Sequence, residues 1–210
     1  MANNTSLYSL AERLRKQLQS RLSTEAKVSM QEAILAIGSA RDKIIQNKLY
    51  AQYHTDGHMV IQNLMSEYGY DEKLNPVWDA DRELYSLRLP ALPIELPKNS
   101  GIVDVRVKGQ KDYSFIQSEP FNGTMYRGLA AATIPRAEFF QKGANIYFSE
   151  DSVGGKTNII LTMIASSSGI NDRDTLPIDP DMEMDIIEMA KQTVLTPDKP
   201  VDVLNDGVGQ

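Results

Sequence analysis

The sequence predicts an α+β protein with N-terminal helices, a small and mostly antiparallel β-sheet or sandwich, one C-terminal helix and mobile termini. Two observations lead to this prediction. Residues 101–165 carry short runs of β-favouring side chains separated by turn residues. On either side, residues 7–50 and 182–194 place apolar side chains at helical spacings of three and four. We expect one compact domain with these segments in order: a helical region over 1–70, a proline-rich extended lead-in over 71–100, a β core over 101–165, a loop and C-terminal helix over 166–195, and a tail over 196–210.

The first helix is expected over Leu7–Leu22. Its apolar residues recur every three or four positions, while arginines and lysines occupy the other sides. A cationic amphipathic helix suits either a membrane surface or a packed protein interface. The packed interpretation is favoured, because the segment has few bulky aromatic anchors and a modest charge.

A second helix is expected to begin at Ser23 or Thr24, which are good N-cap residues, with Glu25 favoured at the positive end of the helix dipole. The pattern persists through Tyr50. Gly38 inside it is either a weak point or a place where another helix approaches closely. The expected buried stripe is Ala26, Met30, Ala33, Ile34, Ile37, Ala40, Ile44 and Lys48.

The segment His54–His58 interrupts this helix. An apolar-periodic run then resumes over Met59–Tyr68 and ends at Gly69. The pattern predicts a helical hairpin, with one long bent helix as the alternative.

Residues 70–98 are polar and punctuated by prolines. Each proline pushes its predecessor toward extended geometry and removes a backbone donor from any ladder. The segment is therefore expected to run along the β region rather than to form a central strand, anchored by Ile94 and the leucines Leu89, Leu92 and Leu96. A ligand for a proline-recognition module is the alternative.

The first strand of the β core is expected from Gly101 to Val107. Val103, Val105 and Val107 would lie on one face, with Asp104 and Arg106 on the other. This alternation indicates a half-buried strand, which Gly109 ends.

Two later runs, 145–148 and 158–164, flank a polar link over Ser149–Thr157. The arrangement predicts a β-hairpin with a long loop. Its second arm is apolar on both faces, so it should be central.

Between the first strand and this hairpin, the sequence offers Tyr113, Phe115 and Ile116, a turn at Asn122-Gly123 and one more strand within 125–134. Pro135 is expected to open a short helical turn through Phe139 and Phe140, two core residues, that Gly143 closes.

The final helix is expected to follow Asp179 as N-cap, with Pro180 in its first turn. Its expected buried side is Met182, Ile186, Met189, Ala190 and Val194. Beyond Thr196 we expect a tail that is mobile in an isolated subunit, with scattered apolar residues at Val201, Val203 and Leu204.

Composition excludes several classes of function. The 210 residues include no cysteine, so thiol catalysis and thiolate metal sites are excluded. The N-terminus lacks the pattern of a signal peptide, and the longest apolar run, Ile159–Ala165, is too short to cross a bilayer, which predicts a soluble protein. With 28 acidic against 22 basic residues, the formal charge of -6 argues against a surface that grips nucleic-acid phosphates.

The glycines in Ser152–Thr157 suggest a phosphate loop. Such a loop needs a glycine where this chain has Glu150, and a helix where Thr157 is followed by a strand. A carboxylate would repel the phosphate. A hairpin turn therefore explains the segment better than nucleotide binding.

His54, Asp56 and His58 are the candidate metal ligands. Two imidazoles and a carboxylate at alternating positions can converge on one ion. Polar residues at a helix break are the simpler explanation, because no further ligand pattern lies nearby. The acidic pairs Asp172 with Asp174 and Asp179 with Asp181 fit loop solvation and helix capping better than glycosidase chemistry. We expect no catalytic residues, no metal and no cofactor.

Four stretches together resemble the neck and ring structural proteins of crAss-like tailed bacteriophages: Leu89–Pro93, Gly101–Val105, Phe139–Phe148 and Leu176–Ile187. The resemblance spans roughly residues 25–190 and rests on the order and character of these stretches. It implies a virion protein that assembles into a closed ring, expected to be dodecameric, between portal and tail. DNA leaves the capsid through such a ring.

We therefore expect a non-enzymatic, homo-oligomeric component of the virion, made in the bacterial cytoplasm, that contacts portal, adjacent ring or tail proteins and no membrane. An acidic channel wall would let the duplex pass without specific binding. The expected interface regions are the first helix, the loop Ser149–Thr157 and the tail Val201–Leu204. The alternatives are a metal-dependent hydrolase that uses His54, Asp56 and His58, and a cytosolic scaffold or adaptor with helical partners.

Overall fold

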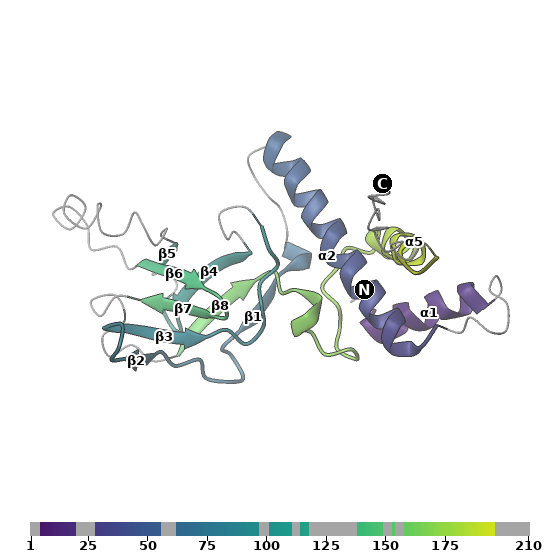
Figure 1. Cartoon of the computed structure of the whole chain (residues 1–210). Helices are drawn as coiled ribbons and strands as arrows, with labels where there is room; N and C mark the ends of the chain where they lie inside the picture. Colours follow the sequence, from purple (N-terminus) through teal and green to yellow (C-terminus); the bar gives the residue numbers. More distant parts are fainter. Residues whose placement is uncertain are drawn as a thin grey trace, which may run out of the picture. The chain divides into compact units, whose positions relative to one another are not determined.

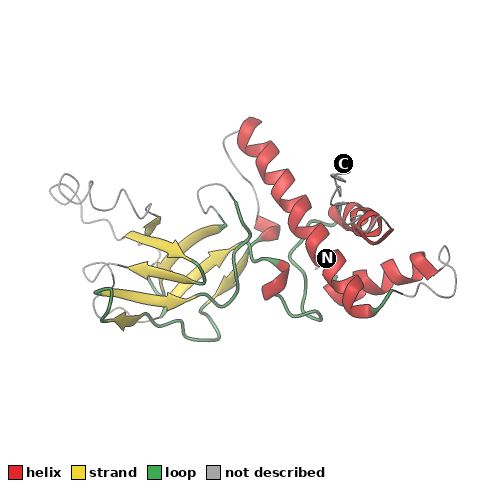
Figure 2. Cartoon of the chain, in the orientation of Figure 1, coloured by secondary structure: helices red, strands yellow, loops and turns green. Residues whose placement is uncertain are grey.

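The structure is a computed structural model with an α+β fold, and it divides into two compact units (Figures 1 and 2). The helical unit is formed by Met1–His58 with Asn171–Gln210, and the sheet unit by Met59–Ile170. The C-terminal helix thus belongs with the N-terminal helices, and the boundary placed at residue 70 falls inside the sheet unit. The structure describes residues 5–19, 28–55, 62–96, 101–110, 114–117, 138–148, 153 and 158–195.

The helical unit contains α1 (Leu7–Gln19), α2 (Met30–Thr55) and α5 (Met182–Leu195). The first helix is confirmed: its leucines and Ala11 form one buried stripe at spacings of three and four. The predicted end at Leu22 lies outside the described residues. None of the helices in the described part of the chain has the length and apolar character that a bilayer-spanning segment requires.

A reciprocal cap marks the start of α2. The backbone N–H of Glu32 donates to the hydroxyl of Ser29 at 3.1 Å, and the backbone N–H of Ser29 donates to the Glu32 carboxylate at 2.8 Å. The second bond, followed by the bond with the Ser29 side chain, lowers the pKa of Glu32 from its usual 4.5. This cap therefore stabilises α2 fully above about pH 4.5 and loses strength as the pH falls through the lowered pKa. The caps expected at Ser23 and Thr24 lie outside the described residues.

Replacing the capping hydroxyl should measurably weaken α2. Ser29→Ala is expected to lower the free energy of unfolding by about 1 kcal/mol, because one helical N–H loses its acceptor. Chemical denaturation followed by the helical circular dichroism signal measures this loss. Ser39→Ala, at an exposed position in the middle of the same helix, is the control and should be neutral or slightly stabilising. Equal effects of the two substitutions would contradict the cap.

The buried face of α2 is rotated from the predicted one. Ala33, Ile37 and Ala40 are buried as predicted. Gly38, which was not part of the predicted stripe, is buried as well. Met30, Ile34, Ile44 and Lys48 are only half-buried, and Ala26 lies outside the described residues. Farther along, Ile45 and Leu49 take the buried positions expected of Ile44 and Lys48, and Arg41 lies between them and Ile37 with no exposed surface. The stripe was misplaced because an arginine at a core position breaks the apolar pattern.

The prediction that the run 59–68 continues as a helix is wrong. Residues 59–61 lie outside the described residues, and the rest of the run is not an α-helix. Gln62–Leu64 forms a single 3-10 turn, and Ser66–Tyr68 is a strand, β1. Gly69 ends β1 with a φ of +100°, and a Cβ on it would lie 2.2 Å from the carbonyl oxygen of Ile159. Only glycine fits this approach of two backbones, which fixes β1 beside its partner strand.

The first sheet has three antiparallel strands in the order β1-β8-β4, with β4 at Ile102–Val107 and β8 at Ile159–Met163. The prediction that this last run is central is confirmed, because β8 lies between two strands and all of it is buried. In β4, Val105 and Val107 are buried as predicted, but Val103 is 43% exposed. The pairing shifts between Ile102 and Asp104, and this bulge turns Val103 out of the valine face.

The second sheet has five strands in the order β2-β3-β7-β6-β5. All neighbours are antiparallel except β5 and β6. The strands are β2 (Val77–Asp79), β3 (Leu84–Arg88), β5 (Ile116–Gln117), β6 (Glu138–Lys142) and β7 (Asn145–Phe148). β7 and β8 therefore belong to different sheets, so the predicted hairpin of these two runs is wrong. Figures 1 and 2 show the strands as arrows.

Two further expectations for this sheet are wrong. Residues 138–142 form β6, which pairs with β7 around Gly143, instead of a helical turn. Phe139 is a core residue as expected, whereas Phe140 is half-buried. Residues 84–88 form β3, which is paired on both sides, although the segment 70–98 was expected to be an extended lead-in rather than a central strand. The prolines at 90 and 93 come after β3 and therefore do not disturb it.

The two sheets share one apolar core. Strands of both contribute buried side chains, including Val105 and Leu161 from the first sheet and Ile146 and Phe148 from the second. The segment after β3 closes part of the unit: Leu89, Ile94 and Leu96 are buried as predicted, while Leu92 is exposed. The expected turn at 122–123 and strand within 125–134 lie outside the described residues, as does Tyr113.

The C-terminal helix is confirmed, but its start and its buried face differ from the prediction. α5 begins at Met182, so Asp179 and Pro180 lie in the turn before it rather than at its N-cap and in its first turn. The backbone N–H of Met182 donates to the carbonyl of Asp179, which forms the turn that starts α5. Met182, Ile186 and Ala190 are buried as predicted, together with Ile187. The remaining predicted positions, Met189 and Val194, are half-buried.

Candidate functional site

The residues proposed from the sequence as sites lie mostly outside the described part of the chain. Asp56 and His58 are outside it, and His54 is in the last turn of α2. Within the described ranges, no three His, Asp or Glu side chains form a group that could hold a metal ion. Of Ser149–Thr157 only Val153 is described, and it is buried in the sheet core. The tail Val201–Leu204 is not among the described residues.

The acidic pairs have structural contacts. The carboxylates of Asp179 and Asp181 lie 3.5 and 3.3 Å from the Lys48 ammonium, which ties the start of α5 to α2. The backbone carbonyl of Asp172 accepts a hydrogen bond from the N–H of Tyr8 at 2.9 Å. Asp174 donates its N–H to the carbonyl of Asn171. These contacts agree with turn and helix-start roles.

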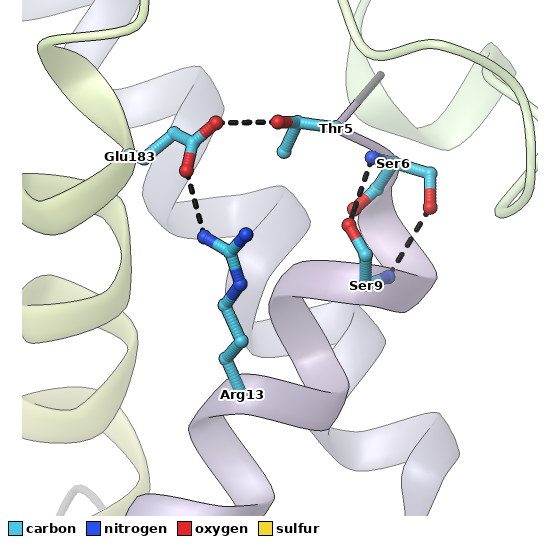
Figure 3. Close-up of polar contacts among 5 residues, drawn as sticks. All are labelled: Thr5, Ser6, Ser9, Arg13 and Glu183. Atoms are coloured by element: carbon cyan, nitrogen blue, oxygen red, sulfur yellow. Dashed lines mark hydrogen bonds and ion pairs between the residues drawn. The ribbon is translucent and has the colours of Figure 1, made fainter. Parts of the chain in front are cut away.

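One carboxylate joins the start of the chain to α5 (Figure 3). Glu183 accepts a hydrogen bond from the Thr5 hydroxyl with one oxygen and lies 2.8 Å from the Arg13 guanidinium with the other. Next to it, Ser6 and Ser9 bond reciprocally at the first turn of α1. Because Arg13 is largely exposed, its ion pair with Glu183 adds little stability. The reciprocal bonds of Ser6 and Ser9 satisfy backbone donors where α1 begins.

A second polar group crosses the outer face of the three-stranded sheet. The Arg106 guanidinium lies 3.1 Å from the Tyr70 hydroxyl and 3.4 Å from Glu67, with Asp104 at 3.8 Å. The bond with Tyr70 is the main reason that the pKa of Arg106 is raised. Lys108 donates to the backbone carbonyl of Tyr70. These contacts join β4, which carries Asp104 and Arg106, to Glu67 on β1 and to Tyr70 after it. They therefore stabilise the sheet across its strands.

The end strand of the five-stranded sheet exposes apolar side chains. Val77 is 66% exposed and Trp78, the single tryptophan of the chain, is 42% exposed. Trp78 packs edge-on against Tyr85 at 5.1 Å between ring centroids. Among the described residues, β2 pairs with β3 alone, so its other side carries open backbone donors and acceptors. We call this the β2 edge.

The turn after β2 holds this edge in place. The Asp79 carboxylate accepts from the backbone N–H groups of Asp81 and Arg82 and forms an ion pair with the Arg82 side chain at 2.8 Å. The hydrogen bond between the side chains of Arg82 and Asp79 is the main cause of the raised pKa of Arg82. The Arg82 guanidinium also lies 5.3 Å from the ring centroid of Tyr147, which stacks on Phe140. A fixed turn pre-organises the edge and lowers the entropy cost of binding.

Sequence reasoning missed the β2 edge. The signal was Val77-Trp78, a β-favouring pair after Pro76 and before an acidic turn, in a segment interpreted through its prolines. No protein-family model matches this sequence, and no curated protein matches it. A functional assignment therefore has to come from the chain's own residues.

Proposed function

We propose that the protein is a non-enzymatic structural component of a tailed-phage virion, a homo-oligomeric ring at the neck between portal and tail through which DNA is ejected. The observation that carries the proposal is the β2 edge, an open strand that exposes Val77 and Trp78. The resemblance of four stretches to neck and ring proteins of crAss-like phages supports the virion setting.

An open strand edge is a template for pairing with another chain. Soluble proteins usually protect such edges with charges or prolines, and tryptophan is enriched at the centres of protein interfaces. A contact between two different patches of identical subunits closes into a ring when the rotation between them allows it. The formal charge of -6 fits a conduit that duplex DNA passes without adhering.

Trp78 provides a direct test of self-association. As the protein concentration rises, its fluorescence maximum is expected to move to shorter wavelength, because assembly removes water from a half-exposed indole. Mass measurement in solution should show an oligomer under the same conditions. Val77→Ser, which keeps the reporter, is expected to weaken association about tenfold, since burying a valine side chain contributes about 1.5–3 kcal/mol.

Leu92→Ser is the matched control, because Leu92 is an exposed leucine of the same unit away from the β2 edge. Leu92→Ser should leave both the shift of the Trp78 fluorescence maximum and the oligomer mass in solution unchanged. A chain that stays monomeric at all concentrations would overturn the proposal. So would absence of the protein from purified particles, or a stoichiometric transition metal that is lost on replacing His54 or His58, which would favour the hydrolase instead.

A further inference from the structure

The outward face of α2 exposes two large apolar side chains, Leu35 and Tyr50, among polar ones. Six of its exposed residues follow one ridge at steps of four and three, namely Gln31, Leu35, Ser39, Lys43, Asn47 and Tyr50, and Glu32 and Ala51 are exposed beside it. Leu35 is 66% exposed and Tyr50 43%, and Lys43 is the single charged side chain of the ridge. Because α2 carries apolar side chains on both faces, it is not the amphipathic helix expected at a protein surface.

The outward face of α5 has the opposite charge. Asp185 and Glu188 are exposed there, flanked by the apolar side chains of Met184, which is 62% exposed, and Leu195. Glu188 already forms an ion pair with Lys191 at 3.0 Å on its own helix. A cation that approaches Glu188 from outside would add to this pair, because the carboxylate has two oxygens and can accept several bonds.

The two faces match in spacing as well as in charge. Lys43 and Tyr50 are separated by seven residues, and so are Glu188 and Leu195. Seven residues of helix correspond to about 10 Å along the axis, so two parallel helices can bring both pairs together at once. Lys43 would then face Glu188, and Tyr50 would face Leu195, as at the seam of two packed helices.

We infer that the α2 face of one copy binds the α5 face of a second copy of this chain. The inference rests on the proposed function and names one contact of the assembly. The two faces belong to different helices, so the contact is heterologous. Each copy can offer its α2 face to one neighbour and its α5 face to another, as a closed ring requires. Charge complementarity selects the second copy as occupant, because Lys43 is the cation of the α2 ridge and Asp185 and Glu188 make the α5 face acidic.

Charge reversal with rescue tests the contact. Lys43→Glu and Glu188→Lys are each expected to raise the concentration for half-assembly at least tenfold, measured by sedimentation or light scattering. The double variant Lys43→Glu with Glu188→Lys is expected to restore most of the association, because the pair is re-formed with reversed signs. Lys73→Glu, an exposed site of the sheet unit, is the control for net charge and should change little.

Tyr50→Ser gives a second reading that leaves every charge in place, and it also should weaken assembly about tenfold. Circular dichroism establishes that each variant is folded. If the unmodified protein forms an oligomer and neither Lys43→Glu nor Tyr50→Ser weakens it, the α2–α5 contact is overturned while the proposed function stands. If the unmodified protein is monomeric, both are overturned.

Discussion

Phe148→Ala is expected to lower the free energy of unfolding of the sheet unit by about 3–5 kcal/mol, among the largest effects of any single substitution. Phe148 has no exposed surface, and its ring lies edge-on to Phe115 at 5.0 Å and tilted to Phe139 at 6.4 Å between centroids. Its strand is paired on both sides, with β3 and with β6, so the backbone cannot move in to fill the space. A cavity would remain at the centre of the core.

Denaturant unfolding followed by Trp78 fluorescence measures this loss, because the tryptophan belongs to the sheet unit. Phe140→Ala is the matched control: the same residue type lies half-buried on the neighbouring strand, stacked on Tyr147. Its cost should be less than half that of Phe148→Ala. Similar losses for the two phenylalanines would contradict the placement of the core between the sheets.

The pairing of β7 and β8 illustrates what the sequence reveals about this fold and what it does not. The run 159–163 is apolar on both faces, and such a run is typical of a strand with a neighbour on each side and cover above and below, as β8 has. Its partner was misassigned because consecutive strands were assumed to pair. In two stacked sheets the chain can pass from one sheet to the other, and β7 and β8 lie on opposite sides of such a crossing.

In the helical unit, too, some features could be predicted from the sequence and others could not. The spacing of leucines predicts α1, and Ser29 with Glu32 is a capping signature that the sequence displays but that was overlooked in favour of Ser23 and Thr24. The position of Arg41 could not be predicted, because charged side chains are almost never fully buried without partners, and its partners come from the same helix and from the distant Pro177.

The candidate site was less predictable than the fold. An exposed Val77 or Trp78 differs from a buried one only in its neighbours, and an amino-acid pattern does not reveal which edge of a sheet remains open. The faces of α2 and α5 become complementary only when the buried sides of both helices are known. Their exposed positions, such as Lys43 and Glu188, look like ordinary solvated charges in the sequence.

Arg41→Ala is expected to lower the free energy of unfolding of the helical unit by about 3–5 kcal/mol. The side chain has no exposed surface, and its guanidinium donates to the Asp42 carboxylate at 2.8 Å and to the Pro177 carbonyl at 3.1 Å. Truncation removes both bonds and leaves a cavity under α2. Arg41→Met, which fills most of the space, should cost less, about 1–3 kcal/mol, because Asp42 is part-exposed and can be hydrated while the Pro177 carbonyl loses a donor.

The helical circular dichroism signal during denaturation measures these losses. Lys16→Ala is the control: Lys16 is an exposed cation on α1 that pairs with Glu12, and its removal should cost no more than about 0.5 kcal/mol. The order of the costs, with Ala above Met and both above the control, is the decisive result, because it separates the lost volume from the lost hydrogen bonds. If Arg41→Ala were as mild as Lys16→Ala, the Arg41 guanidinium would have to reach water, and the connection that it makes between α2 and the segment before α5 would not exist.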